Sequence, residues 1–265
     1  MNSKRRFLHL LICVAVILMS ASCSVNRFIP EGSYLLERVS ISADSSGFNT
    51  QPLQGFVRQH PNSRWFSAMP VPLSVYCLSG TDSTRRFNRF LRRLGEAPVI
   101  YDSLQSMRTC NNMEQAVRGM GYLNAHVVRK ERIRNNRLRL RYEVHPGDIY
   151  RVTHLEVDIQ DSMLSQRLQE ENAMPSLSEG MNFDLNVLDA ERGRISSALA
   201  NKGYYRFNKD YIRFEADTTI GHHQVDLRMK ILPYHITASQ DTILHSQYSI
   251  NKVSFLADTT QSGRP

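Results

Sequence analysis

The residues of this chain that could act in catalysis or metal binding do not form a recognisable constellation. His222 and His223 are adjacent, so they would point to opposite faces of a strand or sit in a turn, and neither arrangement is a recognisable metal site. The acidic residues Asp184, Asp189 and Glu191 lie near the start of a predicted helix, where the helix dipole accounts for them. The motifs GxSxG, HExxH, CxxC and the Walker loop are absent. The sequence therefore predicts no catalytic residue, no metal site and no enzyme activity.

The first 23 residues have the pattern of an export signal that ends in a cysteine. Three cations at positions 4–6 precede a run over 7–19 that is apolar except for one histidine and is too short to span a bilayer. Ser20-Ala21-Ser22 then leads into Cys23, as in a lipobox. Such a cysteine becomes the first mature residue and carries acyl chains that enter a membrane leaflet.

This pattern predicts a lipoprotein signal peptide over residues 1–22 and a lipidated linker over 23–33. Acyl chains on Cys23 are then the only bound group that we expect, with no other cofactor, and outer-membrane lipid is a partner. Residues 24–27 lack an acidic cluster of the kind that directs lipoproteins to the cell surface, which favours the periplasmic face of the outer membrane. An ordinary signal peptide that leaves Cys23 as a free thiol is the alternative.

Composition and charge are those of an ordinary globular protein. Apolar residues make up 41% of the chain and charged residues 22%. The formal net charge of +8 falls to +5 when the three cations of the signal peptide are removed. No groove-sized basic face with stacking or base-reading groups is evident, so we expect neither a nucleic acid nor a small-molecule substrate as partner. Cys77 and Cys110 could form a disulfide or stay free thiols.

A β-α-α-β-β pattern is clearest between Tyr150 and Pro233. Residues 150–158 alternate apolar and polar side chains with one shift of register, which predicts a strand with one buried face. Asp184 is suited to cap a helix that Gly203 ends. The other predicted elements are a helix over 162–171 and strands over 204–215 and 224–232.

An earlier copy of this pattern precedes it. A predicted helix stops at Gly121 as the later one stops at Gly203, 82 residues on, and Pro146 and Pro233, which end the two hairpins, are 87 residues apart. A period near one module length indicates tandem domains. The predicted elements of this copy are a strand over 34–42, helices over 51–59 and 103–120, and strands over 122–133 and 137–144.

We therefore predict an α+β fold of tandem β-α-α-β-β modules. Module 1 covers 34–147 with an insertion over 65–100, and module 2 covers 148–233. Residues 234–265 are expected to form a linker and the start of a truncated third module, because 248–256 resembles another opening strand. No ladder of alternating ten-residue segments predicts a transmembrane barrel in this chain.

Two surfaces are candidates for binding. A three-stranded sheet leaves outer strands whose free N–H and C=O groups can accept an extended peptide as an added strand. The candidate edges are 150–158 and 204–215; the alternative is that these strands only pack within their module. Their marker residues are Val152, Leu155, Val157, Tyr205 and Phe207.

The second candidate surface is a basic amphipathic helix over 84–94. It could contact anionic lipid at a membrane interface. The sequence favours the alternative, in which the apolar stripe is core and the arginines are solvated. The arginines are Arg85, Arg89, Arg92 and Arg93, and the apolar stripe is Phe87, Phe90, Leu91 and Leu94. Arg137, Arg139 and Arg141 alternate along a later strand, where solvent or an acidic partner would face them.

Two stretches resemble a known family. CSVNRFIPEG over 23–32 and GEAPVIYD over 95–102 are similar to the N-terminal region of the translocation and assembly module lipoproteins, the TamL family of the BamA/TamA outer-membrane assembly superfamily. The helix-Gly-Tyr-strand-strand unit resembles the POTRA domain. The resemblance covers about 23–256 and lacks the family's β-barrel.

The resemblance implies a periplasmic POTRA scaffold that positions polypeptides or partner proteins for outer-membrane protein assembly or translocation. The implied partners are a TamB-like periplasmic protein or unfolded outer-membrane polypeptides. A purely structural lipoprotein, or a truncated remnant without a client, is the alternative.

Overall fold

The computed structural model describes residues 25–65, 69–80, 82, 84–235 and 242–255 of the 265-residue chain. These residues divide into two compact units: unit 1 runs to Gly147, and unit 2 takes residues 119–121 and continues from Asp148. The signal peptide and Cys23 lie outside the described residues, so their roles stay predictions. No described helix is both long enough and apolar enough to cross a bilayer.

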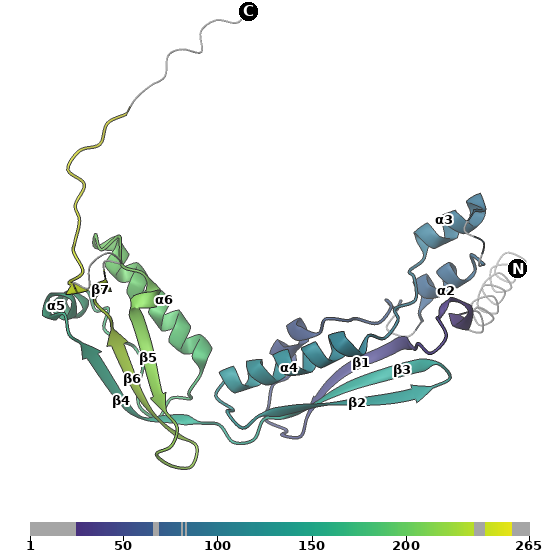
Figure 1. Cartoon of the computed structure of the whole chain (residues 1–265), viewed down its shortest axis with the longest axis horizontal. Coiled ribbons are helices and arrows are strands. Elements are labelled where there is room, and N and C mark those ends of the chain that lie inside the picture. The colour runs from purple at the N-terminus through teal and green to yellow at the C-terminus, as the bar shows by residue number, and fades with distance from the viewer. Residues whose placement is uncertain (1–24, 66–68, 81, 83, 236–241, 256–265) are drawn as a thin grey trace, which may run out of the picture. The chain divides into compact units, whose positions relative to one another are not determined.

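Unit 1 is a three-stranded sheet with helix α4 lying across one face (Figure 1). The strand order is β1-β3-β2, with β1 parallel and β2 antiparallel to the central β3. The strands are β1 (Leu35–Ala43), β2 (His126–Arg134) and β3 (Arg137–His145). The helical segments are η2 (Val25–Phe28), η3 (Gln51–Phe56), α2 (Val71–Cys77), α3 (Arg86–Leu94) and α4 (Ser103–Gly119).

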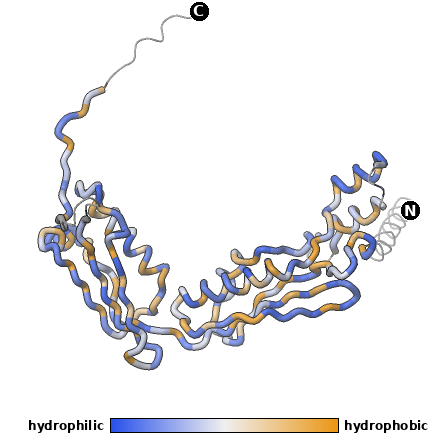
Figure 2. Tube along the Cα trace, in the orientation of Figure 1, coloured by the Kyte–Doolittle hydropathy of each residue, from blue (hydrophilic) through white to orange (hydrophobic). Residues whose placement is uncertain are grey.

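Polar and apolar residues alternate along the strands, and this alternation determines which face of the sheet is buried. Figure 2 shows the trace coloured by the hydropathy of each residue. On β3 the residues Leu138, Leu140, Tyr142 and Val144 are buried, while the residues between them reach solvent to varying degrees. Asn135 and Asn136 both have positive φ, 51° and 58°, as the turn of a two-residue hairpin requires. The turn therefore fixes the register of β2 against β3.

Unit 2 repeats the same plan. The strand order is β4-β6-β5, again with the first strand, β4, parallel and β5 antiparallel to the central β6. The strands are β4 (Arg151–Ile159), β5 (Ile212–Asp217) and β6 (Gln224–Ile231), and a short pair β7 (Tyr234–His235) and β8 (Thr242–Ile243) follows. The helical segments are α5 (Ser162–Glu170), α6 (Leu185–Asn201) and η4 (Lys209–Tyr211).

The two units share details that confirm the predicted α+β fold of two β-α-α-β-β modules. Each first strand has one irregularity of register, between Leu36 and Arg38 in β1 and between Val152 and His154 in β4. The shift of register that the sequence predicted over 150–158 is this bulge. Asp184 caps α6 as predicted, because its carboxylate accepts a hydrogen bond from the backbone N–H of Asn186 at 2.7 Å.

Three element predictions are wrong. The predicted strand over 204–215 begins only at Ile212, because Phe207 is buried in the core beside Leu199 and the chain turns to place it there. Tyr205 and Phe207 therefore lie in a turn and are not on a strand edge. The described residues of the predicted strand 248–256 form no strand, and the predicted helix over 51–59 is a short 3-10 helix.

Candidate functional site

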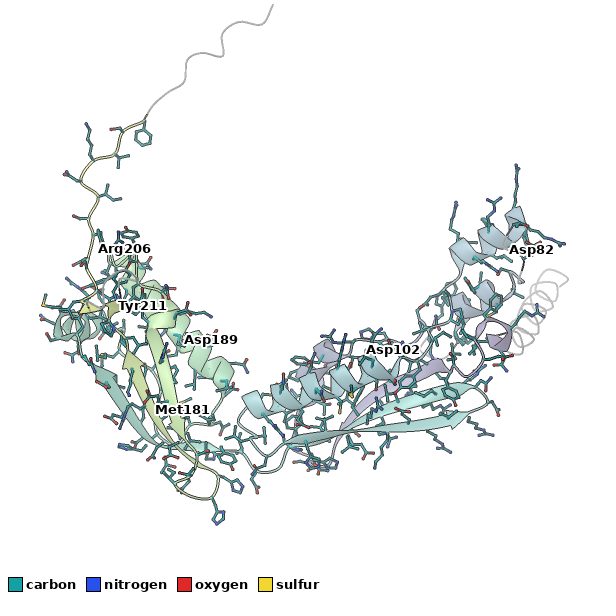
Figure 3. All side chains as sticks on the ribbon, viewed as in Figure 1. Asp82, Asp102, Met181, Asp189, Arg206 and Tyr211 are labelled. Carbon is teal, nitrogen blue, oxygen red and sulfur yellow. The ribbon has the colours of Figure 1, made fainter. Side chains whose placement is uncertain are left out.

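The beginning of β4 is covered by the segment that precedes α6. The Val152 N–H donates to the carbonyl of Met181 at 2.9 Å, and the Gly180 N–H donates to the Val152 carbonyl at 2.7 Å. Met181 is labelled in Figure 3. Because both main-chain groups of Val152 already have partners, this residue of the predicted edge cannot accept an added strand.

The rest of β4 has an open outer edge. The Leu155 N–H donates to the carboxylate of Glu179 at 3.2 Å, so the backbone of this residue faces away from β6. Alternate residues of a strand turn their main-chain groups to the same side, so those of Val157 and Ile159 also face outward. No described group bonds to them on that side. The open stretch therefore runs from the Leu155 carbonyl to the Ile159 N–H.

The outer edge of β5 is open in its middle. Arg192 donates from Nε to the carbonyl of Ile212 at 2.9 Å, which shows that the backbone of Ile212 faces outward and is capped. By the same alternation, the main-chain groups of Phe214 and Ala216 face outward without a described partner. The predicted edge 204–215 contains Phe214 but ends one residue before Ala216, and its marker residues Tyr205 and Phe207 lie outside β5 because the strand was predicted to start too early.

The insertion in unit 1 covers the beginning of β1. The Leu36 N–H donates to the Val99 carbonyl at 2.8 Å, and Arg64 donates to the Glu37 carbonyl at 2.9 Å. The buried side chain of Asn62 holds this segment, because its amide donates to the Ala97 carbonyl at 2.7 Å and accepts from the Val99 N–H at 3.0 Å. Unit 1 thus covers the beginning of its first strand, as unit 2 covers β4 at Val152.

Helix α3 exposes the apolar stripe that the sequence assigned to the core. Phe87, Phe90 and Leu94 are 67%, 55% and 60% exposed, so the favoured expectation is wrong. The helix rests on α2 through close backbone contact at Gly95, and the remainder of its surface has little cover. The predicted arginines Arg85, Arg89 and Arg93 are exposed beside the stripe, and sequence reasoning missed Arg86.

Arg92 differs from the other arginines of this helix because it is a structural clamp. It donates from Nε to Ser79 Oγ at 3.1 Å and from Nη2 to the Gly80 carbonyl at 2.9 Å. Its guanidinium also lies 5.9 Å from the ring centre of Phe28 and 5.7 Å from that of Tyr76. These contacts join α3 to α2 and η2. We call η2, α2 and α3 together the tip of unit 1.

The expected linker after Cys23 is in part folded into this tip. Val25 and Ile29 are buried with Leu73 and Cys77 in a small apolar cluster. Residues 25–29 are therefore not a free linker. Cys77 and Cys110 are both free thiols, which corresponds to the second of the two alternatives, and burial raises the pKa of the Cys110 thiol.

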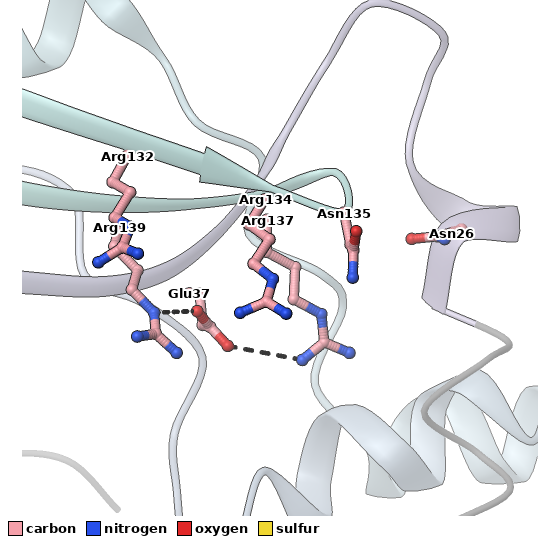
Figure 4. Close-up of a pocket in the computed structure, with 7 residues that line it drawn as sticks. All are labelled: Asn26, Glu37, Arg132, Arg134, Asn135, Arg137 and Arg139. Carbon is pink, nitrogen blue, oxygen red and sulfur yellow. Dashed lines mark hydrogen bonds and ion pairs between the residues drawn. The ribbon is translucent and has the colours of Figure 1, made fainter.

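A basic depression lies on the solvent face of the unit 1 sheet (Figure 4). Arg137 and Arg139 on β3 lie opposite Arg134 and Arg132 on β2, and Glu37 of β1 reaches Arg139 at 2.5 Å and Arg137 at 3.6 Å. The hydrogen bond from Arg139 holds the pKa of the Glu37 carboxyl below its usual range. The sequence indicated Arg137, Arg139 and Arg141 but not the arginines of β2, which the two-residue turn at Asn135 and Asn136 places opposite them.

Comparison with known proteins gives similar structures only. No protein-family model and no curated protein matches the sequence. BamA from Haemophilus ducreyi lacking POTRA domains 1-3 is 13% identical, with a TM-score of 0.38 over 75% of this chain and 29% of that chain. POTRA1-2 of the periplasmic domain of Omp85 from Anabaena is 11% identical, with a TM-score of 0.33 over 78% of this chain and 100% of that chain. The chain thus spans less than a third of the length of the Haemophilus ducreyi protein.

Proposed function

We propose that this chain is a periplasmic, lipid-anchored scaffold for outer-membrane protein assembly or translocation, of the TamL type, and that its two units are POTRA modules. The observation that carries the proposal is the open outer edge of β4 between Leu155 and Ile159. The strand order supports the POTRA assignment, because each unit opens with a strand, continues with helices and closes with a hairpin whose last strand lies in the middle of the sheet. The partners proposed are unfolded outer-membrane polypeptides and a TamB-like protein.

The open edges of unit 2 are suited to extended polypeptide of varied sequence. An added strand is held by main-chain hydrogen bonds, which require no particular side chain from the client. The side chains of Glu156 and Arg228 are already paired at 2.6 Å on the solvent face, and those of Val157 and Ile159 pack against the core. The binding groups that this edge offers are therefore those of the backbone.

Replacing Val157 with proline should weaken binding of an extended client peptide at least about tenfold, because proline removes an outward donor and places its ring toward the added strand. The inward bonds to β6 are made by the neighbouring residues and are kept. Fluorescence anisotropy with a labelled outer-membrane strand peptide measures the affinity.

The matched control is Val157→Thr, which keeps the N–H and should bind as the wild type does. A peptide with alternate N-methylated residues should not bind, since it cannot form the ladder. If Val157→Pro binds the peptide normally, β4 is not the receiving edge. If no client peptide binds any form, a purely structural lipoprotein becomes the better account.

The anchor is proposed at Cys23, with the tip of unit 1 as a second membrane contact. The apolar stripe Phe87, Phe90 and Leu94 is exposed beside arginines, which is the pattern of a helix that lies in a membrane interface. The residues that follow the anchor are packed in the same tip through Val25 and Ile29. An acylated Cys23 would thus tie the membrane to a folded part of the chain.

The wild type should carry acyl mass and sediment with outer membrane, and Cys23→Ala should lose the acyl mass. In the Cys23→Ala chain, Phe87→Ser with Phe90→Ser should lower partition into lipid vesicles at least about tenfold, because two aromatic side chains no longer enter the interface. Intact mass and vesicle sedimentation measure the two effects.

The matched control is Leu104→Ser with Met107→Ser, which removes exposed apolar area from α4 instead. An unacylated wild-type chain would contradict the anchor. Equal loss in both double variants would contradict a specific contact at α3.

A further inference from the structure

The basic depression of unit 1 has the size and lining of a binding site for an anion. Its volume is about 510 Å³, and only polar side chains line it (Figure 4). The lining residues are Asn26, Glu37, Arg132, Arg134, Asn135, Arg137 and Arg139. Because four guanidinium groups and one carboxylate line it, an anion fits this chemistry better than an acyl chain does.

The positive charge in the depression is only partly neutralised. Glu37 pairs with Arg137 and Arg139, whereas Arg132 and Arg134 form no ion pair with any described residue. Four guanidinium groups against one carboxylate leave a charge of +3. Like charges directly opposite each other on neighbouring strands destabilise a sheet, and Arg132 faces Arg139 while Arg134 faces Arg137. A bound anion would relieve this repulsion.

The donor geometry favours a phosphate group. Guanidinium groups present planar pairs of N–H donors that match two oxygens of a phosphate, and such charge-assisted pairs are among the strongest polar contacts in proteins. Glu37 holds Arg139 by a hydrogen bond and so fixes the direction of its free N–H groups. Beyond the depression Lys130 lies opposite Arg141, and Lys130 is paired with Glu143 at 2.6 Å, so the unpaired positive charge is concentrated in the depression.

The position of the depression indicates which phosphate it meets. Asn26, which lines it, is three residues after Cys23, and three residues of chain span at most about 11 Å. If Cys23 is acylated, as the proposed function has it, the depression is held close to the lipid headgroups. We propose that Arg132, Arg134, Arg137 and Arg139 bind the phosphate groups of anionic membrane lipid, so that this sheet face docks on the leaflet that holds the anchor.

The test uses the full chain with Cys23→Ala, so that binding does not depend on acylation. Sedimentation with vesicles of equimolar phosphatidylcholine and phosphatidylglycerol is compared with sedimentation with phosphatidylcholine alone. Arg132→Gln with Arg134→Gln should weaken partition into the anionic vesicles roughly 30-fold at low salt, because each arginine near an anionic surface strengthens binding about fivefold. Added salt should weaken wild-type binding in the same direction.

The matched control is Arg108→Gln with Arg213→Gln, which removes two exposed arginines that form no ion pair with a described residue. It should bind anionic vesicles within about threefold of the wild type. If the Arg132/Arg134 variant binds as the wild type does, or both double variants lose binding equally, the proposal is overturned.

Inorganic phosphate distinguishes the source of the ligand. If inorganic phosphate competes with the anionic vesicles for the protein, the shared phosphate chemistry is supported. If the protein binds inorganic phosphate but does not prefer anionic vesicles, the lipid assignment is overturned. Intact mass of the wild type reports separately on the anchor, and the Val157 variant on client binding. Failure of the depression and failure of the proposed function are therefore read from different measurements.

Discussion

Replacing Gly121 with alanine should lower the free energy of unfolding of unit 2 by about 2–4 kcal/mol. Gly121 has a φ of +96°, which residues with a Cβ rarely adopt, and an added Cβ would lie 2.7 Å from the carbonyl oxygen of Phe183. Its own carbonyl accepts a hydrogen bond from the Tyr150 N–H at 2.8 Å, so any shift of the backbone disturbs the start of β4 as well. Urea unfolding followed by circular dichroism measures the change.

Gly119→Ala is the matched control, because Gly119 is the last residue of α4 and an added Cβ there would meet nothing within 4 Å. This variant should be neutral or stabilising by up to about 1 kcal/mol, since alanine costs less conformational entropy in a helix. Equal losses in the two variants would show that the conformation at Gly121 is not what matters.

Replacing Glu191 with glutamine should lower the free energy of unfolding of unit 2 by about 2–3 kcal/mol at neutral pH. The carboxylate is buried, 5% exposed, and accepts hydrogen bonds from Arg194 and from the backbone N–H and the hydroxyl of Ser176. Arg194 also donates to the Met174 carbonyl at 2.7 Å. The pair thus fastens the loop before α6 to the helix, and the amide of glutamine can replace only part of these contacts.

The effect of this substitution should depend on pH. Burial by itself would raise the pKa of Glu191, but the hydrogen bonds from Arg194 and Ser176 outweigh it, and the pKa in the folded chain lies below its ordinary value of 4.5. A group whose pKa is lowered on folding stabilises the fold above its unfolded pKa, and this contribution is lost as pH falls through the folded pKa. The difference in unfolding free energy between wild type and Glu191→Gln should therefore be constant above about pH 5 and shrink below it.

Asp189→Asn provides the control on the same helix. Asp189 is exposed and pairs with Lys209 at 3.0 Å and with Arg192 at 3.1 Å. Surface ion pairs of this kind are screened by solvent and contribute little to stability, so Asp189→Asn should have a small effect with little pH dependence near neutrality. A Glu191→Gln difference that stays constant down to acid pH would contradict the role given to its charge.

Local patterns in the sequence predicted most of the fold. Alternation, the shift of register in the strand 150–158, the cap at Asp184 and the glycines at 121 and 203 are all properties of short segments, and the structure has each of them. The predicted repeat is also present in the strand pairing. Leu138 pairs with Leu36 in unit 1, and Val225, which is 87 residues after Leu138, pairs with Val152 in unit 2. These features depend on backbone chemistry that a few neighbouring residues determine.

The sites were harder to predict because they depend on what lies across from each residue. Tyr205 and Phe207 alternate like strand residues, yet Phe207 is buried in the core with Leu199 and Ile212. No local pattern in the sequence predicts this contact. The stripe of α3 is apolar enough for a core position, but no other described element covers it. Glu37 and Arg139, 102 residues apart, meet only because β1 pairs with β3.

The two sheets share one strand order but differ in the charged residues that face each other on neighbouring strands. In unit 2, Glu156 pairs with Arg228 and Glu215 with Lys230 across neighbouring strands. Unit 1 has such pairs too, between Glu37 and Arg139 and between Lys130 and Glu143, but there Arg132 also faces Arg139 and Arg134 faces Arg137. The repulsion in unit 1 weakens the folded state, and a ligand that binds the four arginines more tightly when the sheet holds them together stabilises the folded state. If the proposed site binds lipid phosphate, folding of unit 1 and occupation of its basic face are coupled, and the membrane acts as a stabilising ligand for this module and not for unit 2.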